Sequence, residues 1–512
     1  MSLTKVTYSM IAGSPANVLD FGADNTGATN SATAIANALN SGAGVVVFPP
    51  GVYKMQGGAV VTNTALKRIE GYGATLRADI GGTTNTYMLD TGTNDIQVSI
   101  AGLTFDSLSP ATTQNESWYG GTFSFTYRQY NAGVYVPDGS LLQDCVFKQL
   151  ADALYIGTNS GFPFDRRTKV LNSRFEKNFV TFTGYLCNFI EFSGNTAYLG
   201  SEVTFPSCRN LTITNNSLFL PGTPAIDVGG SGTSSGSQII ISDNISYGRD
   251  PIVIENGFDD MIISNNQCYT TSDSPNGVGI GVTTNTGGQE INRLVISGNK
   301  ISRYNDPYGT GQAAYGILVD ANIDVAVRDI QIEGNQISTI GTGIQVEGFD
   351  SSPRINAVSI RNNTIREVRV NGIVVGNADR VHISDNMLVS DTTVGTSKGI
   401  YLSGIVRGRV RDNVTISFVT NHYYFDGVQS DVLLDNPDHN ATTEALLWGF
   451  GTVTGNLVCR NVVFPTNATP AIGSWARGSF IINPLPASTG YQGATCTLTG
   501  TPGTWLTYGL IS

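Results

Sequence analysis

A short pattern recurs eleven times between about residues 145 and 413 of this 512-residue chain. Each copy begins with two apolar residues on either side of a variable residue, followed by two small or polar residues. The next position is usually Asn, and a variable residue and another apolar residue follow it, as in LTITNNSL (211–218) and IIISDNIS (239–246). The Asn column comprises Asn195, Asn216, Asn244, Asn266, Asn299, Asn335, Asn363, Asn386 and Asn413, with Cys145 and Ser173 at the same place in the first two copies. Successive copies lie 21 to 36 residues apart. A period of this length with variable insertions is typical of a solenoid.

The repeat predicts strands rather than helices. Apolar and polar residues alternate within each copy, and Ile, Val and Thr dominate, as in half-buried strands. In several copies a second strand opens with Gly, for example at 316–319 and 343–346, where Gly is expected to allow a tight turn. Short strands stacked about 4.8 Å apart predict an all-β fold, a right-handed parallel β-helix. We expect the Asn column to be architectural, because Asn tolerates the left-handed backbone of a turn and its amide can bond to the next turn.

Composition limits the range of functions. The formal net charge of −11 argues against nucleic acid as a partner, and the absence of an apolar run of about 20 residues argues against a membrane span. The opening MSLTKVTYSM lacks the charged-then-apolar pattern of a signal peptide. The six Cys have no CxxC spacing, and none of the three His has a plausible partner nearby in sequence. We therefore expect buried thiols, no metal site and no cofactor.

The two ends of the chain differ from the repeat. Residues 1–59 predict an N-terminal cap, with a helix over 32–39 that begins after Asn30 or Ser31 and is stopped by Gly42 and Gly44. A cap is needed because the end of a solenoid exposes unpaired strand edges. We expect residues 60–434 to form the β-helix and residues 435–512 to form a small C-terminal β-domain of short strands between Gly and Pro turns.

Three segments near the N-terminus carry a family resemblance. NVLDFGADNTG (17–27), AIANAL (34–39) and VVFPPGVYK (46–54) resemble the opening of pectate-lyase-like β-helix proteins. With the C-terminal TGTPGTWLTYGLIS (499–512), the chain is most similar to bacteriophage tailspike depolymerases. This resemblance implies a homotrimer on the virion tail, made in the bacterial cytoplasm, that binds and cuts capsule or O-antigen at the host surface. It also implies a C-terminal domain for trimerisation or sugar binding, and attachment to the phage tail through an N-terminal domain that this sequence lacks.

An aromatic insert at residues 107–131 interrupts the repeat. Its aromatic side chains either pack onto the body or a neighbouring chain, or stack on sugar rings. The substrate-binding candidates are Trp118 and Tyr119 in this insert, Tyr155, and Asp350.

The strand after each Asn turn can be aligned between copies. The aligned inward column is Leu154, Val180, Val203, Ile226, Ile252, Ile280, Ile317, Ile344, Ile373 and Ile400. Residues one or three places from this column should point outward, because strand side chains alternate. The outward acids form a diagonal group, Glu202, Asp227 and Glu255, with neighbouring Cα atoms roughly 8 Å apart, and a stacked pair, Asp320 and Glu347, roughly 5 Å apart. We expect catalytic residues among these five and favour the diagonal group, although surface carboxylates with no catalytic role are the alternative.

Two carboxylates in different protonation states suit glycoside hydrolysis. Both groups offer this. The carboxyls of the diagonal group can lie about 5 to about 10 Å apart, a range that includes retaining and inverting enzymes. In the stacked pair, one charge raises the pKa of the neighbouring carboxyl. Lys and Arg are sparse at the outward positions, which favours hydrolysis over β-elimination, a reaction that needs a base and neutralising cations. Elimination by a polysaccharide lyase and glycan binding without cleavage remain alternatives, because one fold can host all three.

Overall fold

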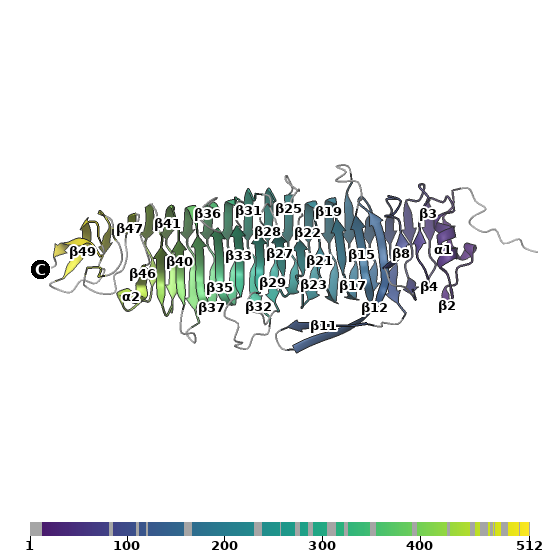
Figure 1. Cartoon of the computed structure of the whole chain (residues 1–512), viewed down its shortest axis with the longest axis horizontal. Coiled ribbons are helices and arrows are strands. Elements are labelled where there is room, and N and C mark those ends of the chain that lie inside the picture. The colour runs from purple at the N-terminus through teal and green to yellow at the C-terminus, as the bar shows by residue number, and fades with distance from the viewer. Residues whose placement is uncertain are drawn as a thin grey trace, which may run out of the picture. The chain divides into compact units, whose positions relative to one another are not determined.

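The computed structural model of the chain forms two compact units, residues 1–252 and 253–512. Figure 1 shows their helices and strands. The described residues are 13–510 apart from 81–84, 109–111, 119–120, 158–165, 230–237, 256–257, 272–276, 285–289, 305–313, 322–325, 349–354, 392–396, 428–430, 451–455, 461–468, 472–474, 476, 483–489 and 501.

Unit 1 is built from three stacks of short parallel strands, so that each turn of the chain adds one strand to each stack. Stack 1 contains β1 (Ala16–Asn17), β3 (Val45–Val47), β6 (Arg68–Glu70), β9 (Ser99–Ala101), β13 (Leu141–Gln143), β16 (Thr168–Leu171), β19 (Asn188–Ser193), β22 (Arg209–Thr214) and β25 (Gln238–Ser242). Stack 2 contains β2 (Thr26–Asn30), β4 (Gly51–Met55), β7 (Ala74–Ala78), β10 (Thr104–Ser107), β14 (Val146–Lys148), β17 (Arg174–Asn178), β20 (Thr196–Gly200), β23 (Ser217–Leu220) and β26 (Ile245–Gly248). Stack 3 contains β5 (Ala59–Val60), β8 (Thr86–Asp90), β12 (Gly121–Pro137), β15 (Leu150–Gly157), β18 (Phe182–Tyr185), β21 (Val203–Thr204) and β24 (Ile226–Val228).

Unit 2 repeats the same plan, and the chain enters it within β27 (Ile252–Glu255). Stack 1 contains β28 (Asp260–Ser264), β31 (Arg293–Ser297), β34 (Arg328–Glu333), β36 (Ile355–Arg361), β38 (Ala378–Ser384), β41 (Arg407–Arg411), β44 (Asp431–Asp435) and β47 (Asn456–Arg460). Stack 2 contains β29 (Gln267–Thr270), β32 (Lys300–Arg303), the first parts of β35 (Gln336–Gly348) and β37 (Thr364–Gly376), β39 (Met387–Ser390), β42 (Val414–Ile416) and β45 (Asp438–His439). Stack 3 contains β30 (Val278–Thr283), β33 (Tyr315–Ala321), the second parts of β35 and β37, β40 (Lys398–Ser403), β43 (Asn421–Asp426) and β46 (Trp448–Phe450).

These stacks confirm the predicted right-handed parallel β-helix. In unit 2 the parallel pairing continues past residue 434 to β47, which pairs with β44. A small antiparallel sheet then follows, made of β48 (Phe480–Ile482), β49 (Tyr491–Leu498) and β50 (Thr504–Leu510). Short strands joined by turns are present after residue 434, but the first of them extend the solenoid.

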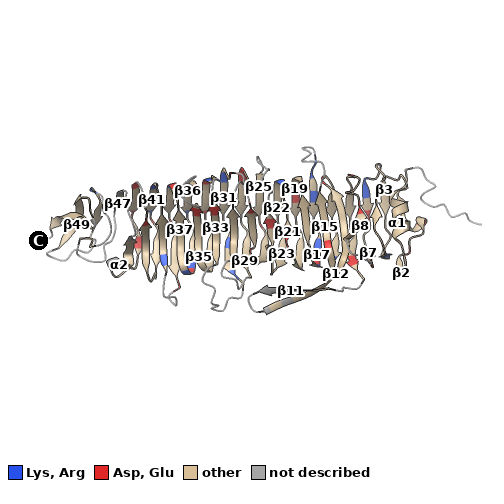
Figure 2. Cartoon of the chain, in the orientation of Figure 1, with Lys and Arg blue, Asp and Glu red and all other residues tan. Residues whose placement is uncertain are grey.

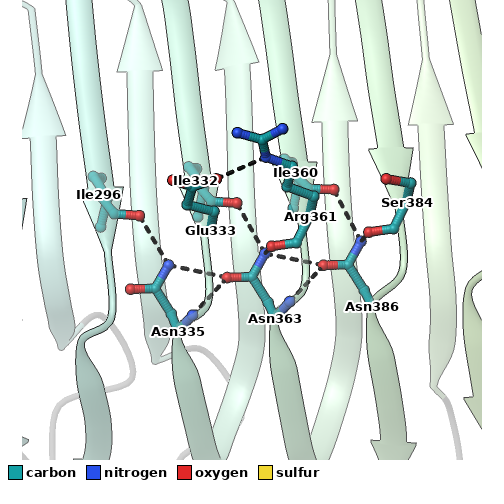
Figure 3. Close-up of polar contacts among 9 residues, drawn as sticks. All are labelled: Ile296, Ile332, Glu333, Asn335, Ile360, Arg361, Asn363, Ser384 and Asn386. Atoms are coloured by element: carbon teal, nitrogen blue, oxygen red, sulfur yellow. Dashed lines mark hydrogen bonds and ion pairs between the residues drawn. The ribbon is translucent and has the colours of Figure 1, made fainter.

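The Asn column of unit 2 forms a buried ladder of side-chain amides (Figure 3). Asn363 Oδ1 accepts hydrogen bonds from the backbone N–H and the Nδ2 of Asn335, both at 3.0 Å. Asn363 Nδ2 donates to the Ile332 carbonyl and to Asn386 Oδ1, both at 2.9 Å. Each amide therefore satisfies buried polar groups of two neighbouring turns, which confirms the architectural interpretation.

One part of that interpretation was wrong. The left-handed backbone falls on the residue before the column, for example Asn362 with φ 56° in front of Asn363. The column residue must point its amide into the core, so the preceding exposed residue, usually Asn, Asp or Gly, takes the strained turn.

Unit 1 begins the same ladder with other residues. The Cys145 N–H donates to Ser173 Oγ at 3.3 Å, and the Ser173 N–H donates to Asn195 Oδ1 at 2.8 Å. Asn195 and Asn216 then donate their N–H groups to the next Asn in turn, up to Asn244. The placing of Cys145 and Ser173 in the Asn column is confirmed.

The glycines that open the strands of stack 3 in unit 2 serve close approach between turns. A Cβ on Gly316, Gly343 or Gly372 would lie 2.5–2.6 Å from the carbonyl oxygen of the next glycine in the column. None of the three has a positive φ, so the expected tight turn is not the reason for Gly here. The reason is that successive turns touch backbone to backbone at this corner.

The helix predicted near the N-terminus is present in unit 1. Helix α1 (Ala32–Leu39) follows the N-cap Ser31 and buries Ile35 and Leu39. Before it, the side chain of Asp24 accepts hydrogen bonds from the backbone N–H and hydroxyl groups of Thr26 and Thr29. These bonds lower the pKa of Asp24 and close the GADNTG loop.

The aromatic insert is a hairpin arm in unit 1, formed by β11 (Thr112–Trp118) and the start of β12 (Figure 1). Phe125 and Tyr127 are buried against stack 2, where the Tyr127 ring stacks on Phe179 with centroids 4.9 Å apart. The packing interpretation is confirmed for these two side chains. Trp118 ends β11 and its side chain is not described, while Tyr119 lies outside the described residues.

All six cysteines are buried and free, as predicted. Within the described ranges, no helix is long and apolar enough to cross a membrane.

Candidate functional site

Stack 3 is the surface on which the candidate acids lie. Its register confirms most of the predicted inward column: Val203 pairs with Ile226 in unit 1, and in unit 2 Ile280, Ile317, Ile344, Ile373 and Ile400 pair in succession. Val180 was wrong, because Phe182 pairs with Val203 and is fully buried. A shift of two residues preserves alternation, so the pattern alone could not detect this slip.

The stacked acids of unit 2 are direct neighbours, as predicted. Asp320 on β33 pairs in register with Glu347 on β35. Burial raises the pKa of Glu347, and the charge of Asp320 raises it further. Asp320 keeps an exposed side chain, yet the surrounding protein excludes enough water to raise its pKa as well. Gln345 Nε2 donates to Glu347 Oε2 at 2.8 Å and fixes one side of that carboxyl.

The next turn leaves room for these carboxyls. Gly376 is the register partner of Glu347, and a Cβ on it would lie 3.1 Å from Glu347 Cγ. Ser403 and Asp426 follow in the same column on β40 and β43. Acidic positions therefore recur on this stack of unit 2 (Figure 2).

Two tyrosines and a lysine lie beside this acidic column. Tyr401 and Tyr424 are register partners, with ring centroids 5.1 Å apart in an edge-to-face arrangement. Lys398 Nζ lies 4.5 Å from the Tyr401 ring centroid and 3.9 Å from that of Tyr424. Burial lowers the pKa of Lys398 and raises the pKa of Tyr401. Lys398 and the two tyrosines therefore form a cluster on the same stack as the Asp320–Glu347 pair, two turns further along the chain.

The diagonal group is divided between the two units. In unit 1, Glu202 lies one residue before Val203, and Asp227 lies one residue after its partner Ile226. Both are partly exposed, and Thr204 Oγ1 donates to Asp227 Oδ2 at 3.3 Å. Glu255 is exposed at the end of β27 in unit 2.

Tyr155 is half-buried on β15 and lies in the same outward column as Asp227. Phe205, one residue after Thr204, is fully buried in the core of unit 1. Asp350 lies outside the described residues.

The described parts of the chain contain no group of three or more His, Cys, Asp or Glu residues that could bind a metal ion. A hollow of about 480 Å³ lies on stack 1 of unit 2, lined by Arg293, Arg361, Arg380 and His382 among others. Arg361 is paired with Glu333 at 2.7 Å and Arg293 with Asp260. These ion pairs indicate a solvated, salt-bridged face rather than a reaction centre.

Sequence reasoning missed Gln345, Lys398, Tyr401 and Tyr424. They could have been found by continuing the outward columns from Glu347 to the later strands that open with Gly. The sequence pattern could not show that Gly376 leaves space beside Glu347.

Comparison with known proteins places the N-terminal part of the chain. Residues 16–76 match the model of the rhamnogalacturonase A/epimerase, pectate-lyase-like family. A search of curated proteins found no match.

Several solved structures are similar to this chain at low identity. Tailspike gp61 of the Pseudomonas phage phi297 is 13% identical, with a TM-score of 0.37, over 94% of this chain and 88% of that one. Tailspike protein 3 of bacteriophage CBA120 is 13% identical, with a TM-score of 0.35, over 96% of this chain and 68% of that one. The catalytic domain of a GH87 α-1,3-glucanase is 11% identical, with a TM-score of 0.35, over 84% and 68%. The fold and the N-terminal match show that this chain is similar to pectate-lyase-like β-helix proteins. The comparison with phage tailspikes rests on this similarity.

Proposed function

We propose that this protein is an endo-acting glycoside hydrolase that depolymerises a bacterial surface polysaccharide, with Asp320 and Glu347 as its catalytic pair. The observation that carries the proposal is the in-register pairing of two outward carboxyls whose pKa values are both raised. Glycoside hydrolysis requires one carboxyl that carries a proton and one that is ionised. In this proposal Glu347 is the carboxyl that carries the proton and Asp320 is the ionised one.

The spacing of the pair suggests a retaining reaction. Adjacent strands place the two backbones about 4.8 Å apart, close to the carboxyl separation of about 5–5.5 Å in retaining enzymes. Glu347 gives its proton to the leaving glycosidic oxygen while Asp320 attacks the anomeric carbon, and the bond to the leaving sugar breaks. Glu347 then takes a proton from water, whose oxygen replaces Asp320 at that carbon. The rings of Tyr401 and Tyr424 offer apolar faces for neighbouring sugars.

A second candidate is β-elimination from a uronate. Lys398 is the observation that favours it, because a lysine with a lowered pKa can act as a base and Tyr401 or Tyr424 could supply a proton. The three carboxylates of the neighbouring column, Asp320, Glu347 and Asp426, disfavour it, since they repel an anionic substrate.

The wider biological role is part of the same proposal. The N-terminal and C-terminal sequence resemblance supports a tailspike that forms a homotrimer, attaches to the phage tail and acts at the host surface. Light scattering of the purified chain should then give three times the subunit mass of 54.3 kDa. A monomeric mass would contradict this part of the proposal alone.

The reaction can be identified with a panel of purified bacterial capsular and O-antigen polysaccharides. We expect shortened chains with new reducing ends and no ultraviolet absorbance of an unsaturated uronate, and Glu347→Gln should abolish the shortening. The absorbance would establish elimination, and binding without shortening would leave a receptor-binding spike. Proton magnetic resonance of the first product should show a retained anomeric configuration. An inverted product would contradict the retaining step but not the hydrolysis.

A further inference from the structure

Unit 1 carries a second outward column on its own stack 3, built from different residues. Pairing between successive turns aligns Asp90, Tyr135, Tyr155, Thr183, Thr204 and Asp227. At about 4.8 Å per turn this column is about 24 Å long. It has two aromatic rings and two hydroxyl groups between carboxyl groups at its ends.

The tyrosines of this column lie against the sheet instead of projecting from it. A Cβ on Gly92 would lie 2.3 Å from the Tyr135 ring, and one on Gly157 would lie 2.9 Å from the Tyr155 ring. The two glycines therefore provide the space in which the rings rest beside the backbone. The ring centroids of Tyr135 and Tyr155 are 5.2 Å apart, and both side chains are only half-buried.

A third tyrosine, Tyr87, packs against these two rings. The Tyr87 ring centroid lies 5.6 Å from that of Tyr135 and 6.5 Å from that of Tyr155. Its hydroxyl donates to Asp152 Oδ2 at 2.5 Å, and Asp152 is 7% exposed. Among the residues that the structure describes, Asp152 Oδ1 is buried with no hydrogen-bond partner. A buried acid with an unpartnered oxygen lowers the stability of the folded state. The hydrogen bond that holds the Tyr87 hydroxyl gives Asp152 a structural role.

We propose that this column is a second glycan-binding site, specific for uncharged sugar units. Half-buried tyrosine rings offer apolar faces to sugar rings, while carboxylates and threonine hydroxyls bond to sugar hydroxyls. None of the six column residues is Lys or Arg, and its two ends are acidic, so an anionic sugar would be repelled. The proposal rests on the proposed function to the extent that the ligand is a polysaccharide.

The test is a binding titration with the full chain made inactive by Glu347→Gln. Polysaccharides from the same panel, sorted into neutral and acidic repeating units, serve as the probe. We expect Tyr155→Ala to weaken binding of a neutral polysaccharide about tenfold, the order of one lost stacking contact. Tyr155→Phe keeps the ring face and should retain most of the affinity.

Tyr198→Ala is the matched control. Tyr198 is a 50% exposed tyrosine on stack 2 of the same unit, where it stacks on Phe219. Its loss should leave binding unchanged, and thermal unfolding midpoints of all variants should show that each has folded. The proposal is overturned if Tyr155→Ala binds as tightly as its parent, if Tyr198→Ala weakens binding equally, or if no neutral polysaccharide binds. Retained cleavage by Glu347→Gln would refute the proposed catalytic pair and leave this binding result to stand by itself.

Discussion

Stack 3 has the same backbone plan in both units but presents different chemistry. In unit 1 the outward column carries Tyr135 and Tyr155 between acidic ends, whereas in unit 2 the corresponding surface carries Asp320 next to Glu347. The inward residues of both are buried hydrophobic side chains. The comparison teaches that the solenoid fixes where an outward side chain lies, while the side chain alone decides whether that position binds or reacts.

The Asn ladders of the two units also differ in the side chains that they contain. Unit 2 has Asn at every column position from Asn266 to Asn413, and each amide links two turns. Unit 1 begins with Cys145 and Ser173, which make fewer bonds. The ladder of unit 2 is therefore expected to contribute more to stability per turn.

The largest expected effect is on kcat, and it distinguishes stack 3 of unit 2 from stack 3 of unit 1. Asp320→Asn and Glu347→Gln should each lower kcat about a thousandfold, because they remove the proposed nucleophile and the proposed acid. Asp227→Asn and Glu255→Gln, from the diagonal group, should change kcat less than about threefold. Initial rates on a shortened polysaccharide check both. A large loss of kcat in Asp227→Asn, together with a normal kcat in Glu347→Gln, would instead indicate a catalytic site in unit 1.

The next effect is on stability. Asn363→Ala removes four hydrogen bonds to buried groups and should lower the free energy of unfolding by about 4 kcal/mol. Ser173→Ala should cost about 1 kcal/mol. Denaturant unfolding measures both, with Asn362→Gly as a control that keeps the left-handed turn. Equal losses at Asn363 and Ser173 would contradict the difference between the ladders.

A third prediction concerns the pH dependence of stability in unit 1. Burial raises the pKa of Asp152 to about 6, above its ordinary value of 3.8. The folded state then binds this proton more tightly than the unfolded state, so the contribution is favourable below about pH 4 and is lost as pH rises through about 6. The loss is about 2 to 3 kcal/mol. Asp152→Asn should flatten that part of the unfolding curve, and an unchanged slope would argue against a buried acid at this position.

The smallest expected effect concerns Lys398. In a hydrolase, Lys398→Gln removes a cation–π contact worth about 1 kcal/mol and should reduce activity less than about tenfold. In a lyase it would remove the base and abolish activity. Reaction rates of this one variant therefore separate the two chemistries on unit 2.

The fold could be predicted because its determinants are periodic. Three features recur every few dozen residues: the alternation of apolar residues, the Asn of the column and the Gly that opens a strand. Stacking of the turns brings equivalent residues of successive repeats into contact. The pairing of Asp320 with Glu347 followed from that alignment and is confirmed.

Other features depended on packing that the pattern does not encode. The slip between Val180 and Phe182 preserves the alternation, so only the packed core distinguishes the two. The left-handed turn residue was misplaced because burial of the amide, rather than backbone preference, decides the column. The bond between Asp152 and Tyr87 joins residues 65 positions apart in sequence, a distance that the repeat pattern does not relate.

The central claim is that unit 2 cleaves the polysaccharide and unit 1 binds it, and steady-state kinetics of two variants tests this most directly. Tyr155→Ala should raise KM about tenfold with kcat unchanged, because it removes a contact equal in the ground and transition states. Glu347→Gln should lower kcat about a thousandfold with KM little changed. If Tyr155→Ala instead lowers kcat as far as Glu347→Gln does, the two surfaces do not divide these tasks.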